Sequence, residues 1–260
     1  MTEPRETFVS TPQGRTRVWR KGAGERVGVF PGIGGQPKWS PFLEALSQTR
    51  QVVAVSLPGF PGGPRSEGLD THLDWIVAAR DAMIAADLRG VHLVGASVGG
   101  ALAAEMAALW PDDVKSLTLI APFGLFVEAE PVADVFAQPP GGMSAILSCK
   151  PKEFDAFLAA PKGVDKAEWE IDALRARVAA AGIVWPLGDT GLSKRMARIS
   201  APTLFVWGDG DKVVPPAYSR RFGKAIAGKA KYKTVKNAGH VAEFDQPAAV
   251  AAAILAFLEA

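Results

Sequence analysis

Short β-rich runs, several of them apolar throughout, alternate along this chain with stretches that carry apolar residues at helical spacing. The runs RTRVWR, RVGVF, QVVAVSL, VHLVGA and KSLTLIA precede residue 122, and TLFVWG and KYKTVK follow residue 200. Strands that are apolar along their whole length are typical of parallel sheets, because both faces of such a sheet are covered. The alternation therefore predicts an α/β fold with a mostly parallel central sheet and helices on both faces.

The alternation stops between Pro122 and about Arg198, where the sequence contains the breaker-rich segment QPPGGM and no convincing strand. Two helical stretches follow that segment, one near 151–161 and one from Asp165 to Ala181. We therefore predict a core formed by residues 1–121 and 199–260, interrupted by a helical insertion at 122–198. A chain of 260 residues with 48% hydrophobic content is large enough to bury such a core in one domain.

Composition argues against several classes of partner. The formal net charge is +2 and the basic residues are scattered, so we expect neither nucleic acid nor a membrane as a partner. The N-terminus lacks the pattern of a signal peptide, and the longest apolar run, PAAVAAAILAFL, is too short to span a bilayer. The single cysteine, Cys149, has no partner within the chain and is interpreted as a packing residue. These features predict a cytoplasmic protein; they do not indicate an oligomeric state.

The segment from Gly95 to Gly99 has the pattern Gly-x-Ser-x-Gly, between a predicted strand and a predicted helix. In this setting the pattern is typical of a nucleophile elbow, a tight turn that exposes the hydroxyl of its serine, here Ser97, above the sheet. A glycine-rich turn with a helix-capping serine gives the same five letters. The pentapeptide alone therefore leaves the nucleophile and the capping serine as alternatives.

A serine nucleophile needs a general base, and the chain has three histidines. His240 directly follows the predicted strand KYKTVK, at the sheet edge where open α/β sheets bind ligands. His92 lies inside a predicted strand and is interpreted as a packed, hydrogen-bonded residue, and His72 at a probable helix start as a surface or capping residue. His240 is therefore the predicted base.

The base in turn needs a carboxylate that fixes its tautomer. Asp209 and Asp211 both follow the predicted strand TLFVWG, and we choose Asp211 because Asp209 lies between glycines, where an aspartate commonly caps a turn. The resulting order Ser97, Asp211, His240 is one of the known chain orders of such triads.

A glycine-rich loop, Pro31 to Gly35, lies between another predicted strand and helix. Its backbone N–H at Ile33, together with that of Val98 after the serine, is predicted to form the oxyanion hole. The loop lacks the Lys-Ser/Thr ending of a phosphate-binding loop and the full Gly-x-Gly-x-x-Gly spacing. We therefore expect no nucleotide, and we predict neither a cofactor nor a metal.

Taken together, these blocks resemble the α/β-hydrolase superfamily over nearly the whole chain apart from the insertion. Members typically have an oxyanion loop, a turn of the type Asp-x-Pro-Gly, the elbow, a Gly-x-x-Asp-x-x-x-Pro block and a Gly-His pair followed by proline. This chain differs by having Pro31 where relatives often have histidine and Ser56 where they often have aspartate. The matching blocks are Pro31 to Gly34, Ser56 to Phe60, Gly95 to Gly99, Gly208 to Pro215, and Gly239-His240 with Pro247.

The resemblance implies that the insertion is a helical cap above the active site. Its aromatic residues then either line an apolar substrate pocket or form the core of the cap itself. The aromatic residues in question are Phe123, Phe126, Phe136, Phe154, Phe157, Trp169 and Trp185. For the substrate pocket we select Gly32, Phe123, Phe126, Trp185 and Val241.

The predicted function is that of a serine hydrolase that cleaves a small, largely apolar ester or related acyl substrate through an acyl-enzyme. Relatives that use a carboxylate at the elbow, such as haloalkane dehalogenases and epoxide hydrolases, are disfavoured by Ser97. Two alternatives stay open. A hydrolase of carbon–carbon bonds in ring-cleavage products often has tryptophan after the histidine, where this chain has Val241. A non-catalytic ligand-binding protein has no chemical need for all three triad residues.

Overall fold

The computed structural model of the chain describes residues 3–139 and 142–260. Within these residues eight strands form one sheet in the order β1-β2-β4-β3-β5-β6-β7-β8, and β3 to β8 pair in parallel. Only β2 is antiparallel to its neighbours β1 and β4. The fold class predicted from the alternating runs is therefore confirmed. The strands are β1 (Arg5–Thr11), β2 (Gly14–Lys21), β3 (Arg26–Phe30), β4 (Gln51–Val55), β5 (Val91–Ala96), β6 (Val114–Ile120), β7 (Thr203–Gly208) and β8 (Ala230–Val235).

Strand β1 is absent from the strands expected from the sequence. It lies at the edge of the sheet, pairs only with β2, and alternates exposed with half-buried residues. The sequence RETFVST therefore contains polar residues throughout, unlike the apolar runs of the central strands. A prediction that relies on continuous apolar runs overlooks an edge strand of this kind.

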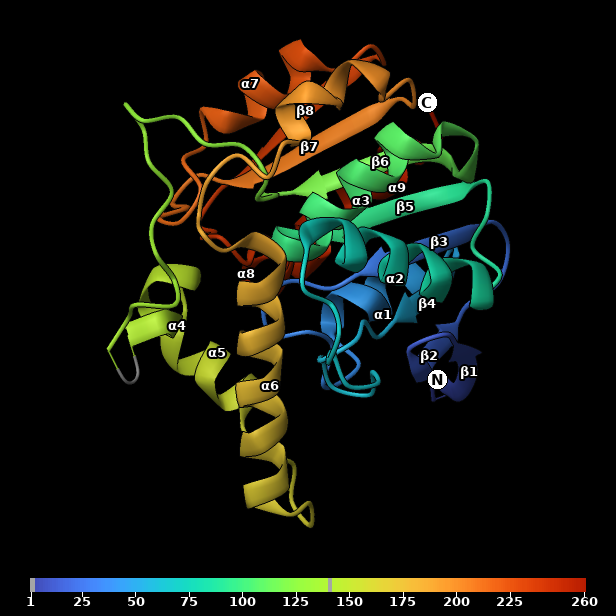
Figure 1. Cartoon of the computed structure of the whole chain (residues 1–260), viewed down its shortest axis with the longest axis vertical. Helices are drawn as coiled ribbons and strands as arrows, with labels where there is room; N and C mark the ends of the chain where they lie inside the picture. Colours follow the sequence, from blue (N-terminus) through green and yellow to red (C-terminus); the bar gives the residue numbers. More distant parts are fainter. Residues whose placement is uncertain (1–2, 140–141) are drawn as a thin grey trace.

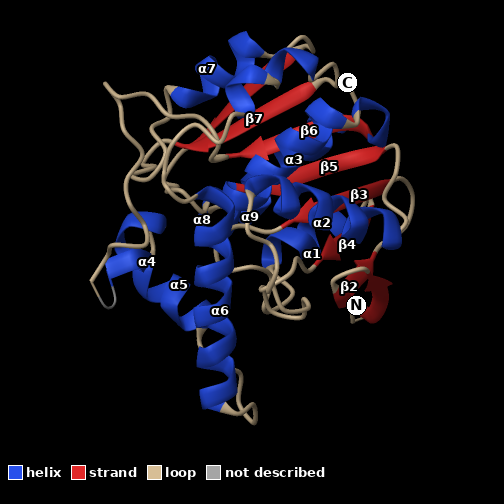
Figure 2. Ribbon diagram, in the orientation of Figure 1, coloured by secondary structure: helices blue, strands red, loops and turns tan. Residues whose placement is uncertain are grey.

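Helices cover both faces of the sheet, as predicted (Figure 2). The first face packs against α1 (Pro41–Ser47), α8 (Ala242–Asp245) and α9 (Pro247–Leu258), whose buried residues share a core with Val94 and Val206. The second face packs against α2 (His72–Ala85), α3 (Ser97–Leu109) and α7 (Tyr218–Ala225). Helix α3 lies over β5 and β6 and is buried along nearly its whole length.

Between β6 and β7 the described residues contain helices and turns but no strand. The helices are α4 (Gly142–Leu147), α5 (Pro151–Leu158) and α6 (Lys166–Val184), and they extend away from the sheet at one end of the molecule (Figure 1). The last two correspond to the predicted helical stretches. Helix α4 was not expected after the breaker-rich QPPGGM, of which Pro140 and Gly141 lie outside the described residues.

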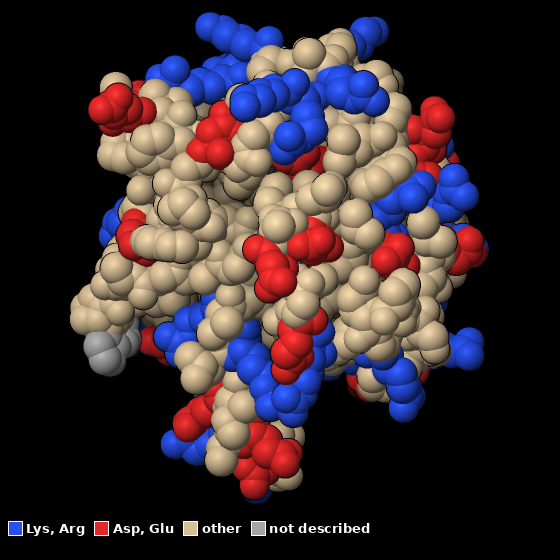
Figure 3. Space-filling model, viewed as in Figure 1, with Lys and Arg blue, Asp and Glu red and all other residues tan. Residues whose placement is uncertain are grey.

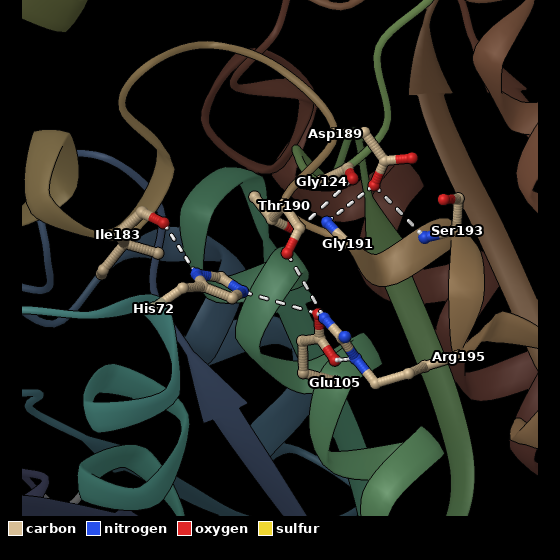
Figure 4. Close-up of polar contacts among 9 residues, drawn as sticks. All are labelled: His72, Glu105, Gly124, Ile183, Asp189, Thr190, Gly191, Ser193 and Arg195. Carbon is tan, nitrogen blue, oxygen red and sulfur yellow. Dashed lines mark hydrogen bonds and ion pairs between the residues drawn. The ribbon is translucent and has the colours of Figure 1, made fainter.

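A polar cluster around the buried carboxylate of Glu105 attaches the end of α6 and the following loop to the core (Figure 4). Arg195 donates to both carboxylate oxygens of Glu105 on α3, at 2.6 and 2.5 Å. His72 Nε2 lies 3.5 Å from the same carboxylate, and its Nδ1 lies 2.9 Å from the carbonyl oxygen of Ile183 on α6. His72 is the first residue of α2, in the capping region as one of the two predicted settings had it, but its side chain also links α2 to α3 and α6. Burial alone raises the pKa of Glu105, but the bonds from Arg195 and His72 outweigh it and hold this pKa below its usual value.

We expect Arg195→Met to lower the free energy of unfolding by about 3–5 kcal/mol, because it leaves the fully buried Glu105 carboxylate without its main partner. Urea unfolding followed by circular dichroism measures the change. The control is Arg175→Met on α6, which removes an exposed pair with Asp172 and is expected to cost less than about 1 kcal/mol. Equal stability of the two variants would contradict the anchoring role.

On the face drawn in Figure 3, side chains of both charges lie along α6, and mainly basic side chains lie near α7.

Within the described parts of the chain, no helix combines the length and the apolar character needed to cross a bilayer.

Candidate active site

The turn between β5 and α3 holds Ser97 in a strained conformation. Its φ is 51°, in the left-handed region that residues with a side chain rarely adopt. Close packing explains the two glycines around it. A Cβ on Gly95 would lie 2.6 Å from the carbonyl oxygen of Gly99, and a Cβ on Gly99 would lie 2.3 Å from that of Pro31. The sequence Gly-x-Ser-x-Gly is therefore required by the backbone here, and a capping serine does not need this geometry.

Three side chains from distant loops meet at this turn. His240 Nε2 lies 2.8 Å from Ser97 Oγ, and His240 Nδ1 lies 3.0 Å from Asp211 Oδ2. All three residues are buried, and the side chains of His240 and Asp211 have no solvent exposure. The structure thus brings together the serine, histidine and aspartate selected from the sequence, in hydrogen-bonding order.

The second carboxylate oxygen of Asp211 also accepts hydrogen bonds. Oδ1 accepts the backbone N–H groups of Val213 and Val214 at 2.8 and 3.0 Å, which fixes the orientation of the carboxylate. Asp209, the alternative, is exposed and accepts a long bond of 3.4 Å from the N–H of Ala238. Gly208 lets this loop approach the histidine loop, since a Cβ there would lie 2.3 Å from the carbonyl oxygens of Ala238 and Gly239.

His92 is packed inside the sheet, as predicted. Its Nδ1 lies 2.8 Å from Ser116 Oγ and its Nε2 lies 3.3 Å from Glu25 Oε2, so both ring nitrogens have partners far from Ser97. Desolvation of the ring lowers the pKa of His92.

Asp245, which the sequence did not single out, holds the loop of His240 in place. The carboxylate is fully buried and accepts the N–H of Gly239 at 2.7 Å, the N–H of Cys149 at 3.0 Å, and the hydroxyl of Ser148. The N–H of Val241 donates to the carbonyl oxygen of Leu147 at 3.0 Å. The residues that flank the histidine are therefore tied directly to the turn between α4 and α5.

The glycine-rich loop after β3 lies against Ser97. A Cβ on Gly32 would be 3.4 Å from Ser97 Cβ, which is van der Waals contact, so this part of the loop lies directly beside Ser97. Ile33 is buried in this loop, and Val98 is buried in the first turn of α3, where backbone N–H groups lack helical partners.

Comparison with known proteins places this arrangement in a family. The model of the Alpha/beta hydrolase family matches residues 29–253, which is most of the chain. The chain belongs to the alpha/beta hydrolase family. This membership confirms the resemblance seen in the sequence blocks.

Named relatives of this alpha/beta hydrolase include esterases. Human monoacylglycerol lipase ABHD6 is 26% identical over 240 residues, which cover 85% of this chain and 71% of that protein. Carboxylesterase YbfK of Bacillus subtilis is 24% identical over 96% of this chain and 86% of its own length. The solved structure of 2-hydroxy-6-oxo-6-phenylhexa-2,4-dienoate hydrolase from Rhodococcus sp. strain RHA1 superposes with a TM-score of 0.78 at 19% identity, covering 99% of this chain and 100% of that one. At 19% sequence identity, this superposition shows only that the two proteins share a fold.

Two cavities border the glycine-rich loop of this alpha/beta hydrolase. The smaller, of about 70 Å³, borders the glycine-rich loop and the loop of His240. The larger, of about 310 Å³, lies between the core and helices α4 to α6. Their shared walls are Ile33, Gly34, Pro37, Phe154 and Leu158.

The structure separates the five residues selected for the substrate pocket. Gly32 and Val241 line the smaller cavity, and Phe123 packs edge-on against the His240 ring at a centroid distance of 5.4 Å. Phe126 and Trp185 line neither of these two cavities and are 40% and 57% exposed. The aromatic residues that do line them are Phe30, Phe42, Phe154, Phe157, Trp169 and Phe244.

Two further residues near the site differ from expectation. Cys149 is exposed in the turn between α4 and α5 and is not a packing residue. Partial desolvation of its sulfur and the nearby Asp245 carboxylate raise the pKa of the thiol, which disfavours a nucleophilic thiolate. Glu243, which lines the smaller cavity, was missed because its side-chain environment depends on loops far away in the sequence. One sequence feature could have drawn attention to it: Glu243 and Asp245 are acidic residues in the mostly apolar stretch that follows His240.

Proposed function

We propose that this protein is a serine hydrolase that cleaves small, largely apolar carboxylic esters through an acyl-enzyme, with Ser97, His240 and Asp211 as its catalytic triad. The observation that carries the proposal is the pair of contacts made by the His240 ring, 2.8 Å to Ser97 Oγ and 3.0 Å to Asp211 Oδ2, in a buried setting. Nucleophile, base and orienting carboxylate are all within hydrogen-bond reach, as serine catalysis requires.

In the first half-reaction Ser97 Oγ attacks the ester carbonyl carbon while its proton passes to His240 Nε2. Asp211 accepts a hydrogen bond from Nδ1–H and stabilises the imidazolium that forms. The backbone N–H groups of Ile33 and Val98 stabilise the oxyanion. The carbon–oxygen bond to the alcohol then breaks, and the imidazolium returns the proton to the departing oxygen. Water repeats the sequence on the acyl-serine and releases the carboxylic acid.

The cavities support an apolar substrate. The larger one has an apolar part, formed by Met143, Leu147, Phe154 and Leu158, which suits an acyl or alkyl chain. Charged side chains also line this cavity: Arg17, Asp155, Asp172 and Arg177. We propose that residues 122–198 act as the cap over the site, because helices α4 to α6 supply most of this wall. The named relatives, a monoacylglycerol lipase and a carboxylesterase, act on esters according to their names.

The test is covalent labelling of the native protein with a fluorophosphonate probe, followed by peptide mass spectrometry. We expect one adduct, on Ser97, and loss of p-nitrophenyl butyrate hydrolysis in proportion to labelling, because only an activated serine reacts readily with such probes. Heat-denatured protein is the control and is expected to remain unlabelled. Undiminished turnover by fully labelled protein, or no labelling at all, would refute the proposed function.

A further inference from the structure

The carboxyl group of Glu243 borders the same loop as the proposed nucleophile, and one of its two oxygens has no hydrogen-bond partner. A Cβ placed on Gly32 would be 3.4 Å from Ser97 Cβ and 3.8 Å from Glu243 Oε1, so the two side chains border the same point of the glycine-rich loop. Glu243 Oε2 is shielded from solvent and has no hydrogen-bond partner. An unpaired buried polar atom is costly, so its retention at this position calls for a function.

Glu243 contributes nothing evident to the fold of its own loop. The neighbouring Asp245 already binds Gly239, Cys149 and Ser148 and holds the histidine loop, whereas no hydrogen bond or ion pair between side chains involves Glu243 among the described residues. The other walls of the small cavity around Glu243 are largely apolar and include Val94, Ile120, Val241 and Phe244. A leucine or methionine would suit such a position at less cost.

The surroundings of Glu243 also determine whether its carboxyl group is protonated. Burial, reinforced by the carboxylates of Asp245 and Asp211, raises the pKa of Glu243 to about 7, although a hydrogen bond to the backbone of Glu243 itself and the nearby His240 oppose this shift. Near neutral pH a large share of the molecules therefore has a protonated carboxyl group. In that form the group donates one hydrogen bond and still accepts others.

The two cavities differ in size. The larger, about 310 Å³, has room for a long chain along its apolar residues, and the smaller, about 70 Å³, has room only for a short group. Both reach the glycine-rich loop at Ile33 and Gly34. An ester whose carbonyl is bound at this loop would have both cavities nearby, the larger for its larger substituent and the smaller for its smaller one.

We propose that Glu243 is a specificity-determining residue whose carboxyl group hydrogen-bonds a hydroxyl on the smaller substituent of the ester. The inference rests on the proposed function and adds the substrate class: esters with one long apolar substituent and one short hydroxylated substituent. Without that hydroxyl, Glu243 Oε2 has no partner in the complex. A site built to bind a hydroxyl discriminates against the analogue that lacks it, because its own polar group is then unpaired.

The experiment compares two matched pairs of esters in which a hydroxyl replaces a methyl group. The first pair, 2-hydroxyethyl octanoate and propyl octanoate, differs in the alcohol; the second, octyl 3-hydroxypropanoate and octyl butanoate, differs in the acyl group. Release of acid is followed by titration at constant pH. In one pair we expect wild-type protein to prefer the hydroxylated member in kcat/KM. We expect Glu243→Met to reduce that preference about tenfold or more, and Glu243→Gln, which still forms hydrogen bonds, to retain most of it.

Two further variants complete the design. Glu243→Leu repeats the test in case the methionine variant fails to fold, and Glu153→Met removes an exposed carboxylate from α5 as a matched control that leaves the preference unchanged. A hydroxyl preference that stays within about threefold of wild type in both pairs, in the folded methionine or leucine variant, overturns the proposal. If wild-type protein hydrolyses none of the four esters, the proposed function itself fails; hydrolysis with an unchanged preference rejects only the role of Glu243.

Discussion

Ser97→Ala is expected to lower kcat/KM for p-nitrophenyl butyrate by about 10⁴-fold or more, because the variant has no nucleophile for His240 to activate. The residual rate above background then comes from the oxyanion donors and from substrate binding alone. Initial rates over a range of substrate concentrations measure the loss, at enzyme concentrations high enough to exclude traces of wild-type protein.

The Ser97→Ala substitution should lower activity without disrupting the fold. Alanine faces the same unfavourable φ of 51° as serine, and the flanking glycines that permit the turn are unchanged. The control is Ser47→Ala, which removes another buried hydroxyl that donates to the carbonyl oxygen of Glu44 on α1, remote from the site. Its activity is expected to stay close to wild type. More than a tenth of wild-type activity in a folded Ser97→Ala protein would be incompatible with an acyl-serine mechanism.

The second large effect is expected for Asp211→Asn, with a loss in kcat of about 10³ to 10⁴-fold. An amide at this position either fails to accept the proton of His240 Nδ1 or donates to that nitrogen, which leaves the ring in the wrong tautomer for removing the proton of Ser97. Two backbone N–H groups also donate to Oδ1 of Asp211 and orient the side chain, so the amide oxygen is expected to remain there and the amide nitrogen to face the histidine.

Asp209→Asn provides the matched control for Asp211→Asn, two residues away in the same turn. Asp209 is exposed, and within the described residues its carboxylate accepts only the long bond from Ala238, so the variant is expected to retain activity within about threefold. Steady-state kinetics of both variants, with thermal unfolding to verify the fold, decide between the two aspartates. Equal losses in the two would mean that the loop as a whole, and not the carboxylate of Asp211, supports catalysis.

The fold and the three proposed catalytic residues were predictable because each depends on local sequence. Apolar strands indicate the parallel sheet, and the parallel sheet brings the loops that follow its strands to one edge. The strain at Ser97 needs Gly95 and Gly99 beside it, and the approach of the Asp211 loop to the His240 loop needs Gly208; these glycines are visible in the sequence.

The lining of the cavities was less predictable, since it depends on where helices α4 to α6 lie. Phe126 and Trp185 were selected as aromatic residues of the insertion, yet both are largely exposed, whereas Phe154 and Leu158 on α5 form the wall between the cavities. Likewise, neither Glu243 nor Asp245 has a local motif. Their environments arise from contacts with Gly32 and with Ser148 and Cys149, which lie about 100 or more residues away along the chain.

The bonds from Asp245 and Val241 to residues 147–149 have a consequence for how substrate enters. The loop of His240, the proposed base, and the turn between α4 and α5 share one buried anchor, so an outward swing of that turn would pull the imidazole away from Ser97. If substrate entered by movement of this turn, the contact between His240 and Ser97 would be lost each time a substrate molecule entered. Substrate can therefore enter and product leave without loss of this contact only if α6 or the neighbouring loops move while the turn between α4 and α5 stays fixed.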